Sequence, residues 1–164
     1  MARDWSTFTR RITISPIAGK SVYDNWAIPR RIESWFLRSA EYVGIDGKPK
    51  SDDQPVAEGD SYLWRWHGYL DDVSETGQIV EANGVDRFAF TFTDGCLVTV
   101  TIKMENGEGV VELTQSQIPE DPNRSIYVDC SYGWAFYLGN LKSILEGGID
   151  LRNKNVDVKN VVNS

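Results

Sequence analysis

The chain has 164 residues, enough for a single domain with a substantial hydrophobic core and short for two, so we expect one domain over residues 1–164. Hydrophobic residues make up 41% of it, which excludes a disordered chain. The formal net charge is −7, with Lys and Arg scattered, which argues against nucleic acid as the main partner.

The cysteine count and the distribution of apolar residues narrow the class of protein further. Cys96 and Cys130 are too few for a disulfide scaffold and lack the paired spacing of a zinc site. The N-terminus has no apolar run typical of a signal peptide, and no stretch approaches the roughly 20 apolar residues that span a bilayer. We therefore expect a cytoplasmic protein with free thiols, no cofactor, no metal and no membrane insertion.

The N-terminal third of the sequence predicts a strand followed by two short helices. Residues 8–14 alternate between apolar and polar side chains, as a strand does. Val22 and Trp26 then share one face of an expected helix, which Pro29 ends. Residues 30–36 are expected to form a second short helix.

The next segment predicts two strands separated by a long loop. Residues 37–43 read as a strand, and residues 44–60 form a polar loop rich in Gly, Pro and Asp. Loops of that length are often lids or disordered segments. In "SYLWRWH", which begins at Ser61, Tyr62, Trp64 and Trp66 occupy every second position, so the three rings point to one face of a strand.

The central part of the chain reads as an antiparallel meander whose first turn can be tested by register. A three-residue loop at residues 93–95 places Phe90 opposite Val98 and Phe88 opposite Val100, whereas a two-residue loop would mix apolar and polar faces. Gly95 is then expected in the left-handed conformation.

The second turn of the meander is a two-residue Asn106-Gly107 loop, the preferred sequence of a type I′ turn. It places Ile102 opposite Val111, and Val100 opposite Leu113. Three consecutive strands then agree on one apolar face.

The C-terminal region changes to a period of 3.6 residues, which predicts a long amphipathic helix. Its apolar stripe consists of Tyr127, Cys130, Ser131, Trp134, Leu138, Leu141 and Leu145. Gly147 and Gly148 are natural residues for its C-terminal cap. The polar tail 150–164 could pack on the body of the domain or join two copies in a homodimer, and both alternatives remain open.

These elements favour an α+β architecture. The meander is aromatic on one face, and one long helix offers a matching stripe. A curved antiparallel sheet of six to seven strands, wrapped around the C-terminal helix and closed at one end by the two short helices, buries both surfaces.

This order of elements resembles the helix-grip fold of the START-like (SRPBCC) superfamily. The segments "ITISPIAGKSVYDNWAIPRRIESWF", "GDSYLWRWHG" and "GWAFYLGNLKSILEGGIDLR" are similar to the corresponding segments of one branch, the family resembling the C-terminal domain of activators of the ninety-kilodalton heat-shock protein ATPase. The resemblance covers about residues 8–152. It implies a cavity between the sheet and the long helix. Members of the superfamily bind lipids, sterols and hormones or cyclise polyketides.

The resemblance and the apolar faces together predict a ligand-binding site. Its candidate residues are Trp26, Trp35, Trp64, Trp66, Phe88, Phe90, Val98, Val100, Leu113, Gln115, Trp134, Leu138 and Leu141. The expected ligand is a small apolar or aromatic molecule, lipid-like or polyketide-like. Composition alone favours a plainly packed aromatic core, because large rings can fill such a cavity, and it is the resemblance that favours an open one.

Two other functions compete with ligand binding. The first is a stress-response or chaperone-associated module that contacts the heat-shock ATPase, although the chain lacks room for the additional chaperone-binding domain of true activators. The second is a cyclase-type enzyme. It would need an ionisable group in the cavity, and the sequence places no acidic residue clearly on the inner face, which favours a non-enzymatic role. His67, the single histidine, alternates onto the opposite face and is expected at the rim.

Overall fold

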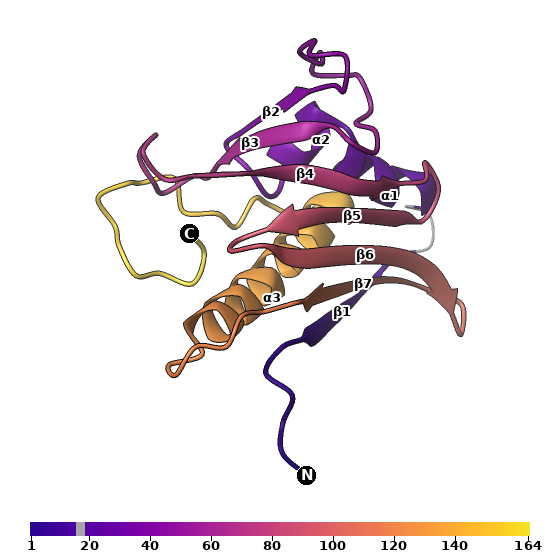
Figure 1. Ribbon diagram of the computed structural model, residues 1–164. Coiled ribbons are helices and arrows are strands. Elements are labelled where there is room, and N and C mark those ends of the chain that lie inside the picture. Colours follow the sequence, from indigo (N-terminus) through magenta and orange to yellow (C-terminus); the bar gives the residue numbers. More distant parts are fainter. Residues whose placement is uncertain (16–18) are drawn as a thin grey trace.

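In the computed structural model, which describes residues 1–15 and 19–164, one seven-stranded antiparallel sheet curves around a long helix (Figure 1). Pro16, in the first of the three segments that carry the family resemblance, lies outside the described residues. The strands lie side by side in the order β1-β7-β6-β5-β4-β3-β2. Their bounds are β1 Phe8–Ile14, β2 Ser39–Val43, β3 Ser61–Arg65, β4 Ser74–Ala82, β5 Arg87–Phe92, β6 Cys96–Glu105 and β7 Glu108–Ser116. The α+β helix-grip prediction is confirmed.

Both hairpin registers expected from the sequence are confirmed. Phe90 pairs with Val98 across a loop at residues 93–95, and Gly95 has a φ of 79°. Val111 pairs with Ile102 across the Asn106-Gly107 turn, where both residues have positive φ, as a type I′ turn requires. The inward rows of β5, β6 and β7 therefore form one apolar surface.

The two short helices follow β1 as expected, but the second is shorter than the sequence indicated. Helix α1 spans Gly19–Ala27 and α2 spans Pro29–Glu33, with Pro29 in the first turn, where its missing N–H costs no hydrogen bond. From Glu33 onward, carbonyl groups of this segment have a partner outside the helix. Arg152 donates to the carbonyl oxygens of Glu33, Ser34 and Leu37.

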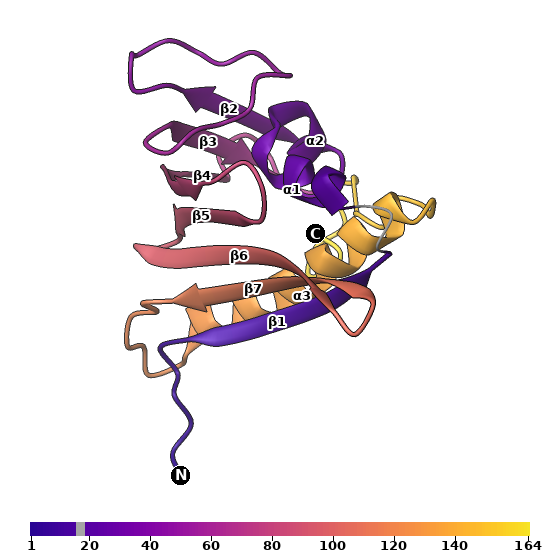
Figure 2. The same ribbon diagram turned by 90° about the vertical axis from the view of Figure 1, so that its right-hand side faces the viewer.

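Helix α3 spans Ser125–Leu145 and lies on the concave side of the sheet, beside β1 and β7 (Figure 2). Its buried positions are Tyr127, Ser131, Trp134, Tyr137, Leu138, Asn140 and Leu141. Gly147, with a φ of 82°, follows the helix in the left-handed conformation. The helix therefore supplies the second wall of the hydrophobic core.

The loop at residues 44–60 is ordered and covers the free edge of β2. The backbone N–H of Lys50 donates to the carbonyl oxygen of Tyr42 at 2.9 Å, and the carboxylate of Glu33 accepts from the N–H of Ala40 at 2.8 Å. The Nζ of Lys50 lies 3.0 Å from the carboxylate of Asp60, whose side chain is only 3% exposed. Such contacts occupy backbone groups that an open edge would offer to another strand.

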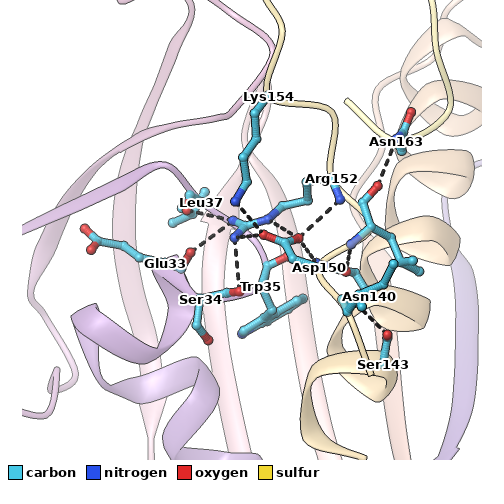
Figure 3. Close-up of polar contacts among 12 residues, drawn as sticks. Glu33, Ser34, Trp35, Leu37, Asn140, Ser143, Asp150, Arg152, Lys154 and Asn163 are labelled. Atoms are coloured by element: carbon cyan, nitrogen blue, oxygen red, sulfur yellow. Dashed lines mark hydrogen bonds and ion pairs between the residues drawn. The ribbon is translucent and has the colours of Figure 1, made fainter. Parts of the chain in front are cut away.

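The segment after α3 is fastened to the body of the domain by a buried polar network (Figure 3). The guanidinium of Arg152, 4% exposed, bonds to Asp150 as well as to the three carbonyl groups at and after the end of α2. Asn140 of α3 donates to the carbonyl oxygen of Trp35 at 2.7 Å and accepts from the N–H of Leu151 at 2.8 Å. Of the two alternatives for the tail, its first residues pack on the body.

Candidate functional site

The candidate ligand-binding residues lie together on the concave side of the sheet. Twelve of the thirteen side chains are at most 2% exposed, and Trp66 is partly buried. They come from α1, from the turn after α2, from β3 and the residue that follows it, from β5, β6 and β7, and from α3. Residues distant in the sequence therefore form one continuous core, and a role of this set in binding stays a prediction.

Aromatic rings fill the centre of that core. The rings of Tyr62 and Trp64 stack with centroids 3.8 Å apart, and Phe90 meets Trp64 edge-on at 5.0 Å. Trp134 of α3 lies 5.0 Å from Phe36. Offset and edge-to-face contacts at such spacings contribute favourably beyond the area they bury, so these rings support one another without any ligand.

One polar side chain, Gln115, is placed within this apolar interior. Its Oε1 accepts a hydrogen bond from the indole N–H of Trp134 at 2.9 Å. Its Nε2 is fully buried and lies near the thiols of Cys96 and Cys130 without meeting the distance and angle of a hydrogen bond. The indole nitrogen of Trp26 is also fully buried and has no hydrogen-bond partner among the described residues. Because an unpaired buried donor costs free energy, these two groups could each bind an acceptor atom of a ligand.

The two thiols lie beside the same glutamine, Cys96 on β6 and Cys130 on α3. Burial raises the pKa of both, that of Cys130 to about 11, although the Gln115 amide opposes the shift. Both thiols are therefore protonated at neutral pH, and a neutral thiol is a weak nucleophile.

An acidic side chain also reaches the inner side, which the sequence did not indicate. Glu75 pairs directly with Trp64 across β3 and β4, so both side chains point to the same face of the sheet. Burial raises its pKa, opposed by a hydrogen bond from Thr93. The expectation of an inner face without an acidic residue was therefore wrong. A general acid would need such a group.

An apolar pocket of about 400 Å³ opens at one end of the concave face, between α1, the end of β1 and the β6–β7 hairpin. Its apolar lining consists of Ile14, Val22, Val85, Ile102, Met104, Val110 and Val111. Asp86, Lys103 and Ser15 stand at the same pocket, and no His or Cys is among its lining residues.

The pocket continues the row of inward side chains that the sequence predicted. Ile102 pairs with Val111, and the next inward pair along the same strands is Val100 with Leu113. None of the thirteen candidate residues lines the pocket itself. The predicted strand register placed Ile102 and Val111 on the apolar face, but it could not show which part of that face is left uncovered, because that depends on how the side chains pack.

His67, expected at the rim, is partly buried and lines a pocket with Arg38, Asp71 and Lys154. Burial lowers its pKa, and the positive charges of Arg152 and Lys154 lower it further. The described residues contain no group of three or more His, Cys, Asp or Glu side chains that could hold a metal ion. Nor does the described part of the chain include a helix with the length and apolarity to cross a membrane.

Comparisons with known proteins agree with this geometry. Protein SSP2350 from Staphylococcus saprophyticus has a TM-score of 0.66 and 18% identity, over 92% of this chain and 98% of that one. The Aha1 dimer from Colwellia psychrerythraea has a TM-score of 0.65 and 15% identity, over 87% and 97%. DynU16, described as a putative protein in the dynemicin biosynthetic locus, has a TM-score of 0.65 and 18% identity, over 88% of this chain and 48% of that chain.

At such identities these structures show the fold alone. The comparison with curated protein sequences found no match. A family model, described as activator of Hsp90 ATPase homolog 1-like protein, matches residues 18–146. The match spans both short helices, β2 to β7 and the whole of α3, which are the elements that build the concave face. The chain belongs to this family of activator of Hsp90 ATPase homolog 1-like proteins.

Proposed function

We propose that this protein binds a small apolar molecule against the concave face of its sheet, in the pocket between α1 and the β6–β7 hairpin. The supporting observation is the pocket of about 400 Å³, lined mainly by aliphatic side chains, in a core that is otherwise filled by rings. Apolar concave sites with a few polar groups at the margin are the usual form of small-molecule sites.

The volume favours a compact ligand. Ligand pockets usually range from about 300 to 1,000 Å³, so this one is near the lower limit. A short lipid-like molecule or a fused-ring, polyketide-like molecule fits better than a long acyl chain. DynU16, which shares the fold, is described only by its place in a biosynthetic locus.

None of the thirteen interior residues lines the pocket, so they would contact only a ligand that extended deeper along the sheet. Leu113 and Val100, the pair next to Val111 and Ile102, are the first that a deeper ligand would contact. Gln115 lies further along the same face and offers the unpaired Nε2. A ligand that reached it would gain a hydrogen bond as well as apolar contact.

The proposal is tested by filling the pocket. Ile102→Phe adds volume at the pocket, whereas Thr101→Phe adds the same ring at the next position, whose side chain points to the other face of β6. We expect Ile102→Phe to weaken binding of the neutral dye Nile red about tenfold and Thr101→Phe to leave it unchanged, since one bulky substitution occupies the site directly. Native mass spectrometry of protein isolated gently from its host checks for a small molecule that the same substitution removes.

Circular dichroism of both variants must match the parent chain before binding is compared. Unchanged Nile red affinity in a folded Ile102→Phe variant would exclude this pocket as the binding site.

A second candidate function rests on the family itself. Its description names activators of the Hsp90 ATPase, so contact with that chaperone is the alternative. Purified chain added to the chaperone should then change its ATPase rate in proportion to the amount added. An unchanged rate at a large excess of chain, together with no complex in sedimentation, would count against this alternative.

A further inference from the structure

Three arginines at one corner of the molecule differ from all the others. The chain has ten arginines, and seven of them form ion pairs with carboxylates: Arg11, Arg30, Arg31, Arg38, Arg65, Arg87 and Arg152. Arg3, Arg10 and Arg124 have no ion pair with any described residue, although acidic residues outnumber basic ones, 24 to 17. The positive charges of these three arginines are therefore not neutralised by a described carboxylate, although the chain has an excess of acidic residues.

Aromatic rings hold these guanidinium groups instead. Arg124 lies over Trp5 with its Cζ 3.9 Å from the ring centroid, and Arg3 lies over the same ring at 4.8 Å. Arg3 also donates from Nη2 to the hydroxyl of Tyr127 at 2.8 Å. Arg10 lies over Phe8 at 5.3 Å and donates to Ser131 of α3. Every cation–π contact within the described part of the chain belongs to this cluster.

Arg3 and Arg124 face a hollow of about 620 Å³ between the N-terminal segment and the connection from β7 to α3. We call it the N-terminal hollow, and its main lining residues are Arg3, Trp5, Ile118, Pro119, Arg124 and Tyr127. The side chain of Arg124 makes no hydrogen bond to the described residues, and that of Arg3 makes only the one to Tyr127. Most of their N–H donors are thus free for a ligand.

The backbone at Arg124 supports this orientation. Arg124 has a φ of 54°, in the left-handed region that is unfavourable for a residue with a side chain. No capping hydrogen bond from its side chain to the helix explains the conformation. This left-handed backbone conformation accompanies the position of the Arg124 guanidinium over Trp5.

Carboxylates also line the N-terminal hollow, but they are directed elsewhere. Asp4 accepts from both the N–H and the hydroxyl of Ser6, and Asp121 accepts from the N–H groups of Asn123 and Ser125. Glu120 is exposed and has no bond to a described residue. None of the three lies within ion-pair distance of Arg3 or Arg124.

The geometry points to the N-terminal hollow as a binding site for an anionic group, a carboxylate or a phosphate, held between Arg3 and Arg124. The planar guanidinium presents paired N–H donors that match the oxygens of either group. Stacking on Trp5 fixes the direction of those donors before a ligand arrives, which reduces the entropy lost on binding.

This site is separate from the apolar pocket. The connection from β7 to α3 and the β6–β7 turn lie at opposite ends of β7 (Figure 2). A failure of one proposal therefore does not affect the other. A ligand with an anionic group on an apolar body would place its charged end in the N-terminal hollow, and this binding would not require the apolar pocket.

The test is a titration of the full chain with inorganic phosphate and, separately, with acetate, at constant ionic strength so that general screening does not change. Nuclear magnetic resonance signals of the Trp5 indole N–H and the Arg124 guanidinium N–H report the site. We expect both to shift saturably with at least one of the two anions. Phosphate alone would identify phosphorylated ligands, acetate alone would identify carboxylic acids, and both together would identify the shared anion chemistry.

Three variants make the result specific. Arg124→Gln should weaken anion binding about tenfold, because it removes one of two charged donors. Glu120→Gln should strengthen it about twofold by removing a nearby negative charge. Arg87→Gln, an exposed arginine paired with Glu81 on another part of the sheet, should leave it unchanged. Absence of a saturable shift with either anion, or an equal loss in the Arg87 and Arg124 variants, would overturn the assignment.

Discussion

At the scale of single residues, Arg152 has the largest consequence for the fold. Its buried guanidinium bonds to three carbonyl groups at and after the end of α2 and to the carboxylate of Asp150. Nothing in the local sequence "GIDLRNK" indicates these partners, because the nearest of the carbonyl groups lies 115 residues earlier in the chain. Single-sequence patterns report periodicity and turns, and they contain no signal for a contact of that separation.

Arg152→Leu should therefore destabilise the protein strongly. The substitution keeps apolar bulk but leaves buried carbonyl groups and Asp150 without their donor, so the free energy of unfolding should fall by about 3 kcal/mol. Urea denaturation measures the change. Arg87→Leu, which removes an exposed ion pair, is the matched control and should change little. Equal losses in the two variants would contradict the structural role.

Asp150 should make stability depend on acid pH. Burial opposes ionisation of this carboxyl, but hydrogen bonds from Arg152 and Lys154 outweigh it and lower its pKa below the ordinary 3.8. A lowered folded-state pKa stabilises the fold above the unfolded-state pKa of about 4, and this contribution is lost as pH falls through the folded-state value. Urea midpoints at pH 5, 4 and 3 should fall more steeply for the parent chain than for Asp150→Asn. Equal pH dependence of the urea midpoint in the two proteins would contradict this role of Asp150.

At the scale of elements, the strands and the long helix were predictable because period and turn chemistry agree there. The Asn106-Gly107 turn and the apolar rows of the two strands that it joins are consistent with only one strand register. Glu75 was missed because its strand has two adjacent aliphatic residues, Ile79 and Val80, on opposite faces. Sequence alternation alone does not show which of these two rows is the buried one, and Glu75 belongs to the row of Ile79.

Helix α3 contains two glycines whose replacement should stabilise it. A Cβ built on Gly133 or Gly139 meets no atom within 4 Å, and neither residue has a positive φ. Alanine at either position should raise the free energy of unfolding by about 0.5–1 kcal/mol, because glycine loses more backbone entropy in a helix. Thermal unfolding tests this. Gly77→Ala is the opposite control, since its Cβ would meet the hydroxyl of Tyr62 at 2.6 Å. A loss of stability in both α3 variants would show that the argument fails.

At the scale of the whole molecule, the sheet and α3 enclose a core whose aromatic composition was readable from the sequence. The sequence did not show whether this core is filled or hollow, and the structure shows it filled by rings apart from the pocket at one end. Void volume depends on how side chains from several elements interdigitate, and a change of one methylene can open or close it. The same limit applies to the N-terminal hollow, which depends on where the connection from β7 to α3 folds.

Removal of one central ring should create a new site in this core. Trp64→Ala removes a fully buried ring that touches Tyr62 and Phe90, and should cost about 3–5 kcal/mol of the free energy of unfolding. A dry apolar cavity of this kind binds a small aromatic molecule. Indole should therefore raise the melting temperature of the variant and leave that of the parent chain unchanged. No recovery with indole would mean that neighbouring rings collapse into the space.

The position of Arg152 has a consequence for synthesis. The carbonyl groups at the end of α2 emerge from the ribosome more than a hundred residues before the guanidinium that bonds to them. The strands of the sheet likewise emerge before α3, which covers their aromatic face. The nascent chain therefore exposes apolar side chains and unpaired carbonyl groups until translation reaches Arg152. Proteolysis and misassembly should threaten the protein most during that interval.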